Sequence, residues 1–298
     1  MRRASTIGCL VLAATLWAAP GVADSQRPAR VVSLDYCADQ YVLALADREQ
    51  IAALSTAATS GYAYFAEQAR GLPQTRATAE DVVMLDPDLV VRHWGGGYRS
   101  GEMIERFGVP VAQIDFGATI DTARANLRTV GRALGHVERA DAVVRELDRR
   151  LAAVRASWHA VPEDARPVAA YVTPSGITTG ADTFVHEVLE AAGLRNLAAG
   201  DGRSGWHPLD LERLVLGPPD AVVAGFYDLK SNHTNNWTIA RHATLRRMLD
   251  DTPTAFVPSR LLACSAWVFV EAVEMVHRQL GPRQAVALDG GLDGGLGR

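Results

Sequence analysis

Lysine is almost missing from this chain of 298 residues, because only Lys230 stands among its 30 basic side chains and the others are arginine. With 34 acidic residues the formal net charge is −4, and no basic stripe interrupts that balance. A nucleic-acid partner is therefore not expected. Apolar residues make up 48% of the chain and charged residues 21%, which is ordinary for a globular protein of one large or two small domains.

Motifs for catalysis and for a resident metal are also missing. The eight histidines are scattered without the close spacing of a zinc motif. Serines 33, 175 and 265 lack a nucleophile-elbow pattern, and the glycines at 95–97 lack the spacing of a phosphate-binding loop. The sequence thus gives no sign of catalytic residues, and we expect no metal site and no cofactor of the protein's own.

The first 23 residues have the pattern of a cleaved signal peptide. Arg2 and Arg3 are followed by an apolar run at 7–19 and by small residues at 21–23. That run is too short to span a bilayer. Cys9 is not expected to carry a lipid, because the apolar run follows it instead of preceding it. We expect an exported, periplasmic protein.

Cys37 and Cys264 are the two cysteines that remain after this cleavage. Each follows a predicted strand. They can be two buried free thiols, which pack as small hydrophobes. In an oxidising compartment they can instead form a disulfide. The sequence leaves both possibilities open.

A long amphipathic helix and a repeat organise the chain. Residues 138–159 contain neither proline nor glycine, and their apolar positions have helical spacing: Val143, Val144, Leu147, Leu151 and Val154. The segment at 80–91 is echoed at 212–223, where Glu80, Pro87 and Asp88 return 132 positions later as Glu212, Pro219 and Asp220. Each copy predicts a short helix, a Pro-Asp turn and a buried strand.

The predicted fold class is α/β. Strands alternate with helices and no hairpin signal is seen, which favours mostly parallel sheets. Two Rossmann-like lobes at residues 28–137 and 166–281 are therefore expected, joined by one long rigid α-helix at 138–159. A Gly-rich, disordered tail is expected at 282–298.

Aromatic residues are few, at 7%, yet most of them follow predicted strands. Ligands bind beyond the carboxyl ends of strands in such sheets. The candidate ligand-binding residues are Tyr36, Tyr62, His93, Trp94, Phe226, Tyr227 and Trp267. Trp94 and Phe226 are 132 positions apart, so we expect two rings facing each other across a cleft. For any single ring, a packing role is the alternative.

The signal peptide, the Arg30-Val-Val-Ser-Leu34 opening, the doubled Pro-Asp strands and the bridging helix resemble the periplasmic binding protein family for cobalamin and ferric siderophores. The resemblance implies a monomer that holds its ligand between two lobes with little closure. It also implies delivery of the ligand to the permease of an ABC importer and its ATPase, the only contact with the membrane. Arg92-His93-Trp94-Gly95-Gly96 resembles the cobalamin-binding branch, which implies a ligand-binding role for Trp94.

The resemblance further implies one acidic docking residue on top of each lobe. Glu102 is the candidate in the first lobe, with Glu105 second, whereas the loop at 231–236 of the second lobe has no carboxylate and Asp228 is the nearest substitute. The expected ligand is a cobalt or iron chelate. Cobalamin or another corrinoid comes first, a ferric siderophore second, and haem third, with Tyr62 or His93 on iron.

Three other classes are considered. A bare metal ion is disfavoured because it needs converging histidines and carboxylates. An exported metal-dependent enzyme would need an acid, base or metal site that the sequence does not assemble. A sensor domain would need an output segment.

Overall fold

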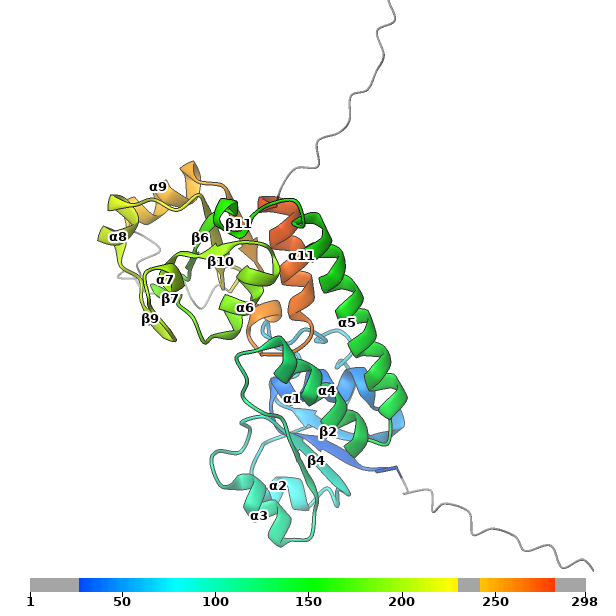
Figure 1. The fold of residues 1–298 in the computed structure, drawn as a ribbon. Helices are drawn as coiled ribbons and strands as arrows, with labels where there is room; N and C mark the ends of the chain where they lie inside the picture. The colour runs from blue at the N-terminus through cyan, green and yellow to red at the C-terminus, as the bar shows by residue number, and fades with distance from the viewer. Residues whose placement is uncertain (1–26, 230–241, 282–298) are drawn as a thin grey trace, which may run out of the picture.

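The computed structural model describes residues 27–229 and 242–281, and Figure 1 shows two lobes with one long helix running beside both. The predicted signal peptide, the Gly-rich tail and the polar loop at 231–236 lie outside the described residues. Within the described part, no helix is long and apolar enough to cross a membrane.

The N-terminal lobe is built on a five-stranded sheet in the order β3-β2-β1-β4-β5, and every pair in it is parallel. Its strands are β1 Val31–Ser33, β2 Ile51–Ser55, β3 Gln74–Thr75, β4 Leu89–Arg92 and β5 Val111–Gln113. Its helices are α1 Tyr36–Leu45, the single turn η1 Arg48–Gln50, α2 Ala79–Val83, α3 Ser100–Arg106 and α4 Ile120–Ala133. Alternate residues of β1 and β4 pack on opposite faces, with Val32 and Val90 toward α3 and Val31 and Val91 in the core shared with α1 and α4.

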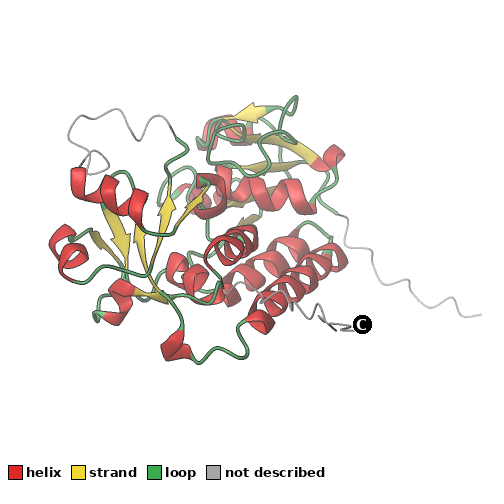
Figure 2. Ribbon diagram, turned by 90° about the horizontal axis from the view of Figure 1, so that it is seen from above, coloured by secondary structure: helices red, strands yellow, loops and turns green. Residues whose placement is uncertain are grey.

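The C-terminal lobe repeats this plan with a four-stranded parallel sheet in the order β11-β10-β6-β8. Its strands are β6 Val168–Val172, β8 Arg195–Asn196, β10 Ala221–Gly225 and β11 Thr254–Val257. Helices lie on both sides of these strands (Figure 2). They are the turn η2 Glu163–Ala165, α6 Phe184–Ala191, α7 Leu197–Gly200, α8 Leu211–Leu216, α9 Ala243–Asp251, α10 Ser259–Leu262 and α11 Phe269–Leu280.

One antiparallel pair was not expected. Strands β7 Ile177–Thr179 and β9 Trp206–Pro208 pair antiparallel at the side of the second lobe. Two helices, α6 and α7, and the strand β8 separate them in the chain, so no hairpin turn marks the pair in the sequence. The expectation of mostly parallel sheets holds for the two main sheets.

The connecting helix α5 runs from Val137 to Ser157, close to the predicted 138–159. Its buried stripe consists of Ala140, Val144, Leu147, Leu151 and Val154. It packs along α4 on the first lobe and along α11 on the second. Gly131 permits the close approach to α4, because a Cβ there would come within 2.4 Å of the Ala140 Cβ.

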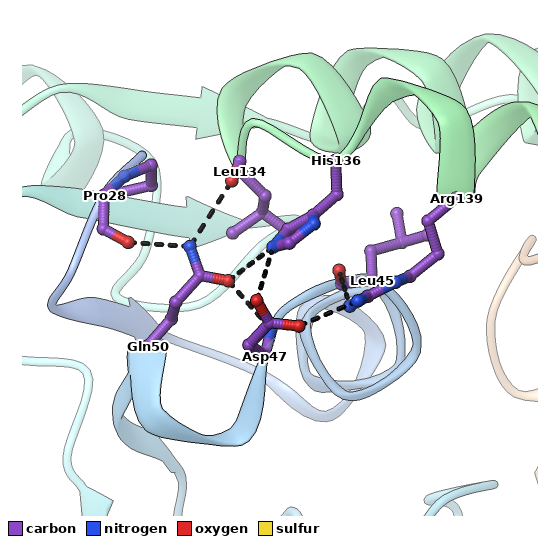
Figure 3. Close-up of polar contacts among 7 residues, drawn as sticks. All are labelled: Pro28, Leu45, Asp47, Gln50, Leu134, His136 and Arg139. Carbon is purple, nitrogen blue, oxygen red and sulfur yellow. Dashed lines mark hydrogen bonds and ion pairs between the residues drawn. The ribbon is translucent and has the colours of Figure 1, made fainter. Parts of the chain in front are cut away.

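A polar cluster fixes the start of α5 to the first lobe (Figure 3). The ring Nε2 of His136 lies 2.7 Å from Gln50 Oε1, and Gln50 Nε2 donates to the Pro28 carbonyl at 2.7 Å. Arg139 donates to the Asp47 carboxylate and to the Leu45 carbonyl, at 2.7 and 2.6 Å. Burial lowers the pKa of His136. The helix is therefore anchored to the lobe by hydrogen bonds as well as by its apolar stripe.

The two lobes share one apolar core and are also linked covalently. Trp267 of the second lobe packs against Tyr41 of the first, with ring centroids 4.8 Å apart. Cys37 and Cys264 form a disulfide whose Cα atoms are 5.6 Å apart. Arg150 of α5 binds Glu274 of α11 at 2.6 Å, and the Tyr64 hydroxyl reaches Glu271 of α11. These contacts agree with a rigid connection between the lobes.

Candidate ligand-binding site

The order of the strands locates one switch point in each sheet. In the first sheet the chain moves outward from β1 through β2 to β3, and then returns to the other side of β1 as β4. In the second sheet β6 has β8 on one side and β10 on the other. Ligands of open α/β sheets bind at the carboxyl ends of the strands at such points. The residues there are Tyr36 after β1, Trp94 after β4 and Phe226 after β10.

Four aromatic rings join the two switch points, and we call them the aromatic row: Trp94, Tyr36, Tyr62 and Phe226. The Trp94 and Tyr36 rings meet edge to face, 5.7 Å apart at an angle of 73°. Tyr36 stacks on Tyr62 at 5.7 Å, and Tyr62 lies 6.4 Å from Phe226 in the second lobe. Trp94 is 46% exposed at the outer end of the row. The ring contacts of the row therefore run continuously from one lobe to the other.

The expected pairing of Trp94 with Phe226 across a cleft needs correction. The two rings lie at the two ends of the row, and the rings of Tyr36 and Tyr62 lie between them, so they do not directly face each other. The repeat offset located both strand ends correctly, but it carries no information on the loop that brings Tyr62 between them.

The backbone at Phe226 is strained. Its φ of 65° lies in the left-handed region, which a bulky side chain seldom adopts. Gly225 before it has no room for a side chain, because a Cβ would lie 2.4 Å from the Tyr171 hydroxyl. A strained backbone conformation persists where the surrounding contacts enforce it, and such residues are frequent at ligand-binding sites. On the first lobe, a Cβ at Gly61 would lie 2.7 Å from Leu229, so the loops on either side of the row touch.

Asp35 was not predicted as a site residue, although it connects the two loops of the first switch point. Its carboxylate caps α1 through the N–H groups of Cys37 and Ala38. The same carboxylate accepts the N–H groups of residues 93, 94 and 95 after β4. An aspartate directly after a strand and before a helix is a recognisable N-cap in sequence. The contact with residues 93–95 requires the tertiary structure.

His93 is buried and lies beside the row, not in it. Its ring stacks on Phe116 with centroids 3.8 Å apart. Burial lowers the pKa of the imidazole, against the opposing effect of Asp35. Three atoms that could in principle bind a metal ion lie within 4.8 Å of one another, one each from Asp35, Cys37 and His93. The Cys37 sulfur is in a disulfide and five N–H groups occupy the Asp35 carboxylate, so this group is unsuited to a metal ion.

Tyr227 and Trp267 are placed differently from expectation. Tyr227 packs on the outer face of the second sheet, 5.8 Å from the Phe256 ring. The strand ends at Gly225, and the left-handed backbone at Phe226 interrupts the alternation that would have placed Tyr227 on the other face. Burial raises the pKa of Tyr227 to about 12. Trp267 is 8% exposed and fills the core between the lobes. Both are therefore packing residues in this structure.

The row carries no permanent charge. The pKa of Tyr36 is raised by burial first, and then by Tyr62 and Asp35, so its phenol stays neutral. Arg92 is buried behind the glycine turn, where its guanidinium donates to the Gly97 carbonyl at 2.9 Å. The basic side chain two positions before Trp94 thus supports the loop instead of facing the row.

Glu102 lies exposed on α3, after the loop that carries Trp94, and pairs with Arg99 at 3.5 Å. Asp228, the substitute considered for the second lobe, accepts the Ser259 N–H at 3.0 Å and also binds its hydroxyl. Its carboxylate is thus engaged within its own lobe.

Several hollows in the described part of the chain lie away from the row, including one of about 1230 Å³ at the amino ends of β4 and β5. Two further hollows border the second lobe. One of about 500 Å³ lies among α4, α5 and α6 and is lined by charged side chains such as Arg155, Arg166 and Glu190. Another of about 330 Å³ lies between the second sheet and α7 and α8. No ring of the row lines either hollow. We place the candidate site at the row because it joins both switch points.

Comparison with known proteins identifies the family of the chain. A family model described as periplasmic binding protein matches residues 31–248. The chain therefore belongs to the periplasmic binding protein family. It is 32% identical to the "Cobalamin-binding protein" of Halobacterium salinarum over 226 residues, which are 74% of this chain. The match spans 60% of that relative's length.

Solved structures share the fold. The apo periplasmic heme-binding protein RhuT from Roseiflexus sp. RS-1 superposes with a TM-score of 0.67 at 22% identity, covering 85% of this chain and 97% of that one. The periplasmic vitamin B12 binding protein BtuF of Vibrio cholerae gives 0.63 at 18% identity, covering 85% and 97%. These likenesses confirm the predicted fold class of two α/β lobes.

Proposed function

We propose that this protein is a periplasmic receptor that holds a cobalt or iron chelate on the aromatic row and delivers it to an ABC importer. The row between the two switch points is the observation that carries the proposal. Its four rings offer an apolar, uncharged surface to a large and partly apolar ligand.

A corrinoid is the favoured ligand. The rings of the row are neutral and Arg92 is turned away from them, so the row suits a chelate that carries little charge on the face that touches it. The similarity to a relative named for cobalamin binding supports the same choice. A ferric siderophore is the second choice in the same class of metal chelate. Neither ligand requires a cofactor or metal of the protein's own.

Haem is the third candidate, because two tyrosines stack at the centre of the row. Tyr62 is the side chain that would reach iron, since a tyrosine oxygen is one of the axial ligands that proteins use. Burial raises the pKa of its neighbour Tyr36, which opposes a phenolate ligand at Tyr36. His93, the other expected iron ligand, is buried against Phe116. These features rank haem below a corrinoid.

The receptor is proposed to act as a monomer after removal of residues 1–23. The membrane would be contacted through the permease, for which exposed Glu102 is the proposed contact on the first lobe. A catalytic role is disfavoured by membership of a family of binding proteins and by the neutral row.

Absorbance titration of purified protein lacking residues 1–23 tests the ligand. Cyanocobalamin, haemin and a ferric trihydroxamate are added separately, and bound ligand is separated by gel filtration. We expect cyanocobalamin to co-elute at a 1:1 ratio. A protein that binds haemin or the hydroxamate and leaves cyanocobalamin free would overturn the corrinoid assignment. A protein that binds none of the three would overturn the metal-chelate class.

A further inference from the structure

Five backbone N–H groups converge on the carboxylate of Asp35, which is 2% exposed. Oδ1 accepts from Cys37 and Ala38 at 3.1 and 2.9 Å. Oδ2 accepts from residues 93, 94 and 95 at 2.9, 3.1 and 2.9 Å. One side chain therefore fixes the first turn of α1 and the loop after β4 with separate oxygens.

We propose that Asp35 is the positioning residue of the ligand site, which sets the Trp94 ring against Tyr36. Tyr36 is the first residue of α1, directly after Asp35, and Trp94 is the middle one of the three loop residues that Oδ2 binds. Both rings are thus attached to backbone that this carboxylate holds. The inference rests on the proposed function only for its effect on ligand affinity.

Packing within the described residues does not by itself fix the Trp94 ring, because nearly half of its surface is exposed and the ring contact that it makes there is the edge-to-face one with Tyr36. The backbone beneath it must therefore be held by other means. Hydrogen bonds to an ionised acceptor are stronger than neutral ones, and a buried acceptor shared by several donors is a rigid anchor.

Gly95 is the second requirement of this arrangement. A Cβ at residue 95 would lie 2.3 Å from the Leu34 carbonyl oxygen, so only glycine lets the loop come close enough for its N–H to reach Asp35. The Leu34 carbonyl and the Asp35 carboxylate belong to the same strand end. Substitution of Gly95 thus tests the same contact from the other side.

An amide at position 35 separates the two functions of the carboxylate. Asparagine offers one accepting oxygen and one donating NH₂ group. If the oxygen keeps the helix cap, the NH₂ group faces three N–H donors and the loop is released. If the oxygen turns to the loop, α1 loses its cap. Either way, Tyr36 and Trp94 are no longer held by a common side chain.

The test compares Asp35→Asn and Gly95→Ala with Asp39→Asn as a matched control. Asp39 is another buried carboxylate on α1, but it binds Ser55 and not the loop after β4. Hydrogen exchange of residues 92–100 and near-ultraviolet circular dichroism are measured without ligand. Affinity for cyanocobalamin is measured on the same preparations.

We expect both loop variants to exchange the amides of residues 93–95 at least about tenfold faster and to bind cyanocobalamin about tenfold or more weakly. The control should change neither property. The proposal is overturned if these amides stay protected in Asp35→Asn, if they are released without loss of affinity, or if Asp39→Asn causes the same losses.

Failure of the proposed function gives a different result. If the wild-type protein does not bind cyanocobalamin, the positioning role is tested by near-ultraviolet circular dichroism without ligand. The part of the signal that is lost in Trp94→Phe is assigned to the Trp94 ring. Its loss in Asp35→Asn supports that role, and its retention overturns it.

Discussion

Asp88 and Asp220 make the same reciprocal pair of hydrogen bonds in the two lobes. The Asp88 carboxylate accepts the Arg30 N–H at 2.9 Å, and the Asp88 N–H donates to the Arg30 carbonyl at 3.1 Å. The Asp220 carboxylate accepts the Val168 N–H at 2.8 Å, and its own N–H donates to the Val168 carbonyl at 2.9 Å. These bonds hold the beginnings of β1 and β6, at the edge opposite the aromatic row. The repeat is thus explained by how each sheet begins and not by the ligand.

Truncation of Trp94 should weaken ligand binding more than it affects folding. Loss of an aromatic hot-spot residue costs on the order of 2–4 kcal/mol, or roughly 30- to 1,000-fold in affinity. Trp206 is a matched control, because it is exposed to a similar extent, 54% against 46%, and lies on β9 outside the row. Calorimetric titration with cyanocobalamin measures the affinity of Trp94→Ala and of Trp206→Ala. Equal affinities in the two variants would remove Trp94 from the site.

Trp267→Ala should show the opposite behaviour. The ring is buried between the lobes against Tyr41, and removal of such a side chain costs about 3–5 kcal/mol of stability. Urea unfolding should show this loss, whereas the folded variant should keep its affinity for cyanocobalamin within a few-fold. A variant of unchanged stability and strongly reduced affinity would return Trp267 to the ligand site.

Reduction of the disulfide should destabilise the protein. A bridge between residues 37 and 264 closes a loop of more than 200 residues, for which the chain-entropy argument gives about 5 kcal/mol as an upper value. The measurement compares urea unfolding of the wild-type protein and Cys37→Ser/Cys264→Ser. Thiol titration of denatured, unreduced protein lacking residues 1–23 is the control. Two free thiols per chain in that titration would contradict the bridge.

Asp39 should make stability depend on pH. Burial raises its pKa from 3.8 to about 6, against the lowering effect of its bonds to Ser55. Because the folded protein holds this proton more tightly, the contribution of Asp39 to stability is complete below pH 3.8 and is lost as the pH rises through about 6. The loss amounts to at most about 3 kcal/mol.

The variant Asp39→Asn isolates this effect, since an amide does not titrate. The difference in unfolding free energy between wild type and variant should fall as the pH rises from 4 to 7 and stay level above that. A difference that is independent of pH would show that Asp39 titrates normally.

Glu102→Arg should impair uptake without changing ligand affinity. The side chain is 61% exposed and lies on α3, beyond the carboxyl end of β4. A positive charge there would repel a basic permease surface and slow association. Uptake of cobalamin by cells and binding by purified protein are compared with Glu49→Arg, an exposed position at the amino edge of the same sheet. Weakened binding by purified Glu102→Arg would place this residue at the ligand instead.

Local sequence patterns were enough to predict the architecture. The predicted copies of helix, turn and strand at 80–91 and 212–223 coincide with α2 and β4 and with α8 and β10. Helix α5 starts and ends within two residues of its prediction. Helical spacing, buried apolar runs and the Pro-Asp repeat all act over short stretches, so they can be read along the chain. The strand ends that carry Tyr36, Trp94 and Phe226 followed from the same patterns.

The tertiary structure alone decided which of these side chains meet. Phe226 and Tyr227 are neighbours in sequence but point to opposite faces of the sheet, and Trp267 turned inward to the core shared by the lobes. Tyr62 enters the row on a loop without regular structure, and Asp35 holds a loop that is almost 60 residues away. The pairing of Cys37 with Cys264 likewise depends on how the lobes pack. Such contacts join distant segments, and their geometry is set by the packing of whole lobes instead of by the residues beside them.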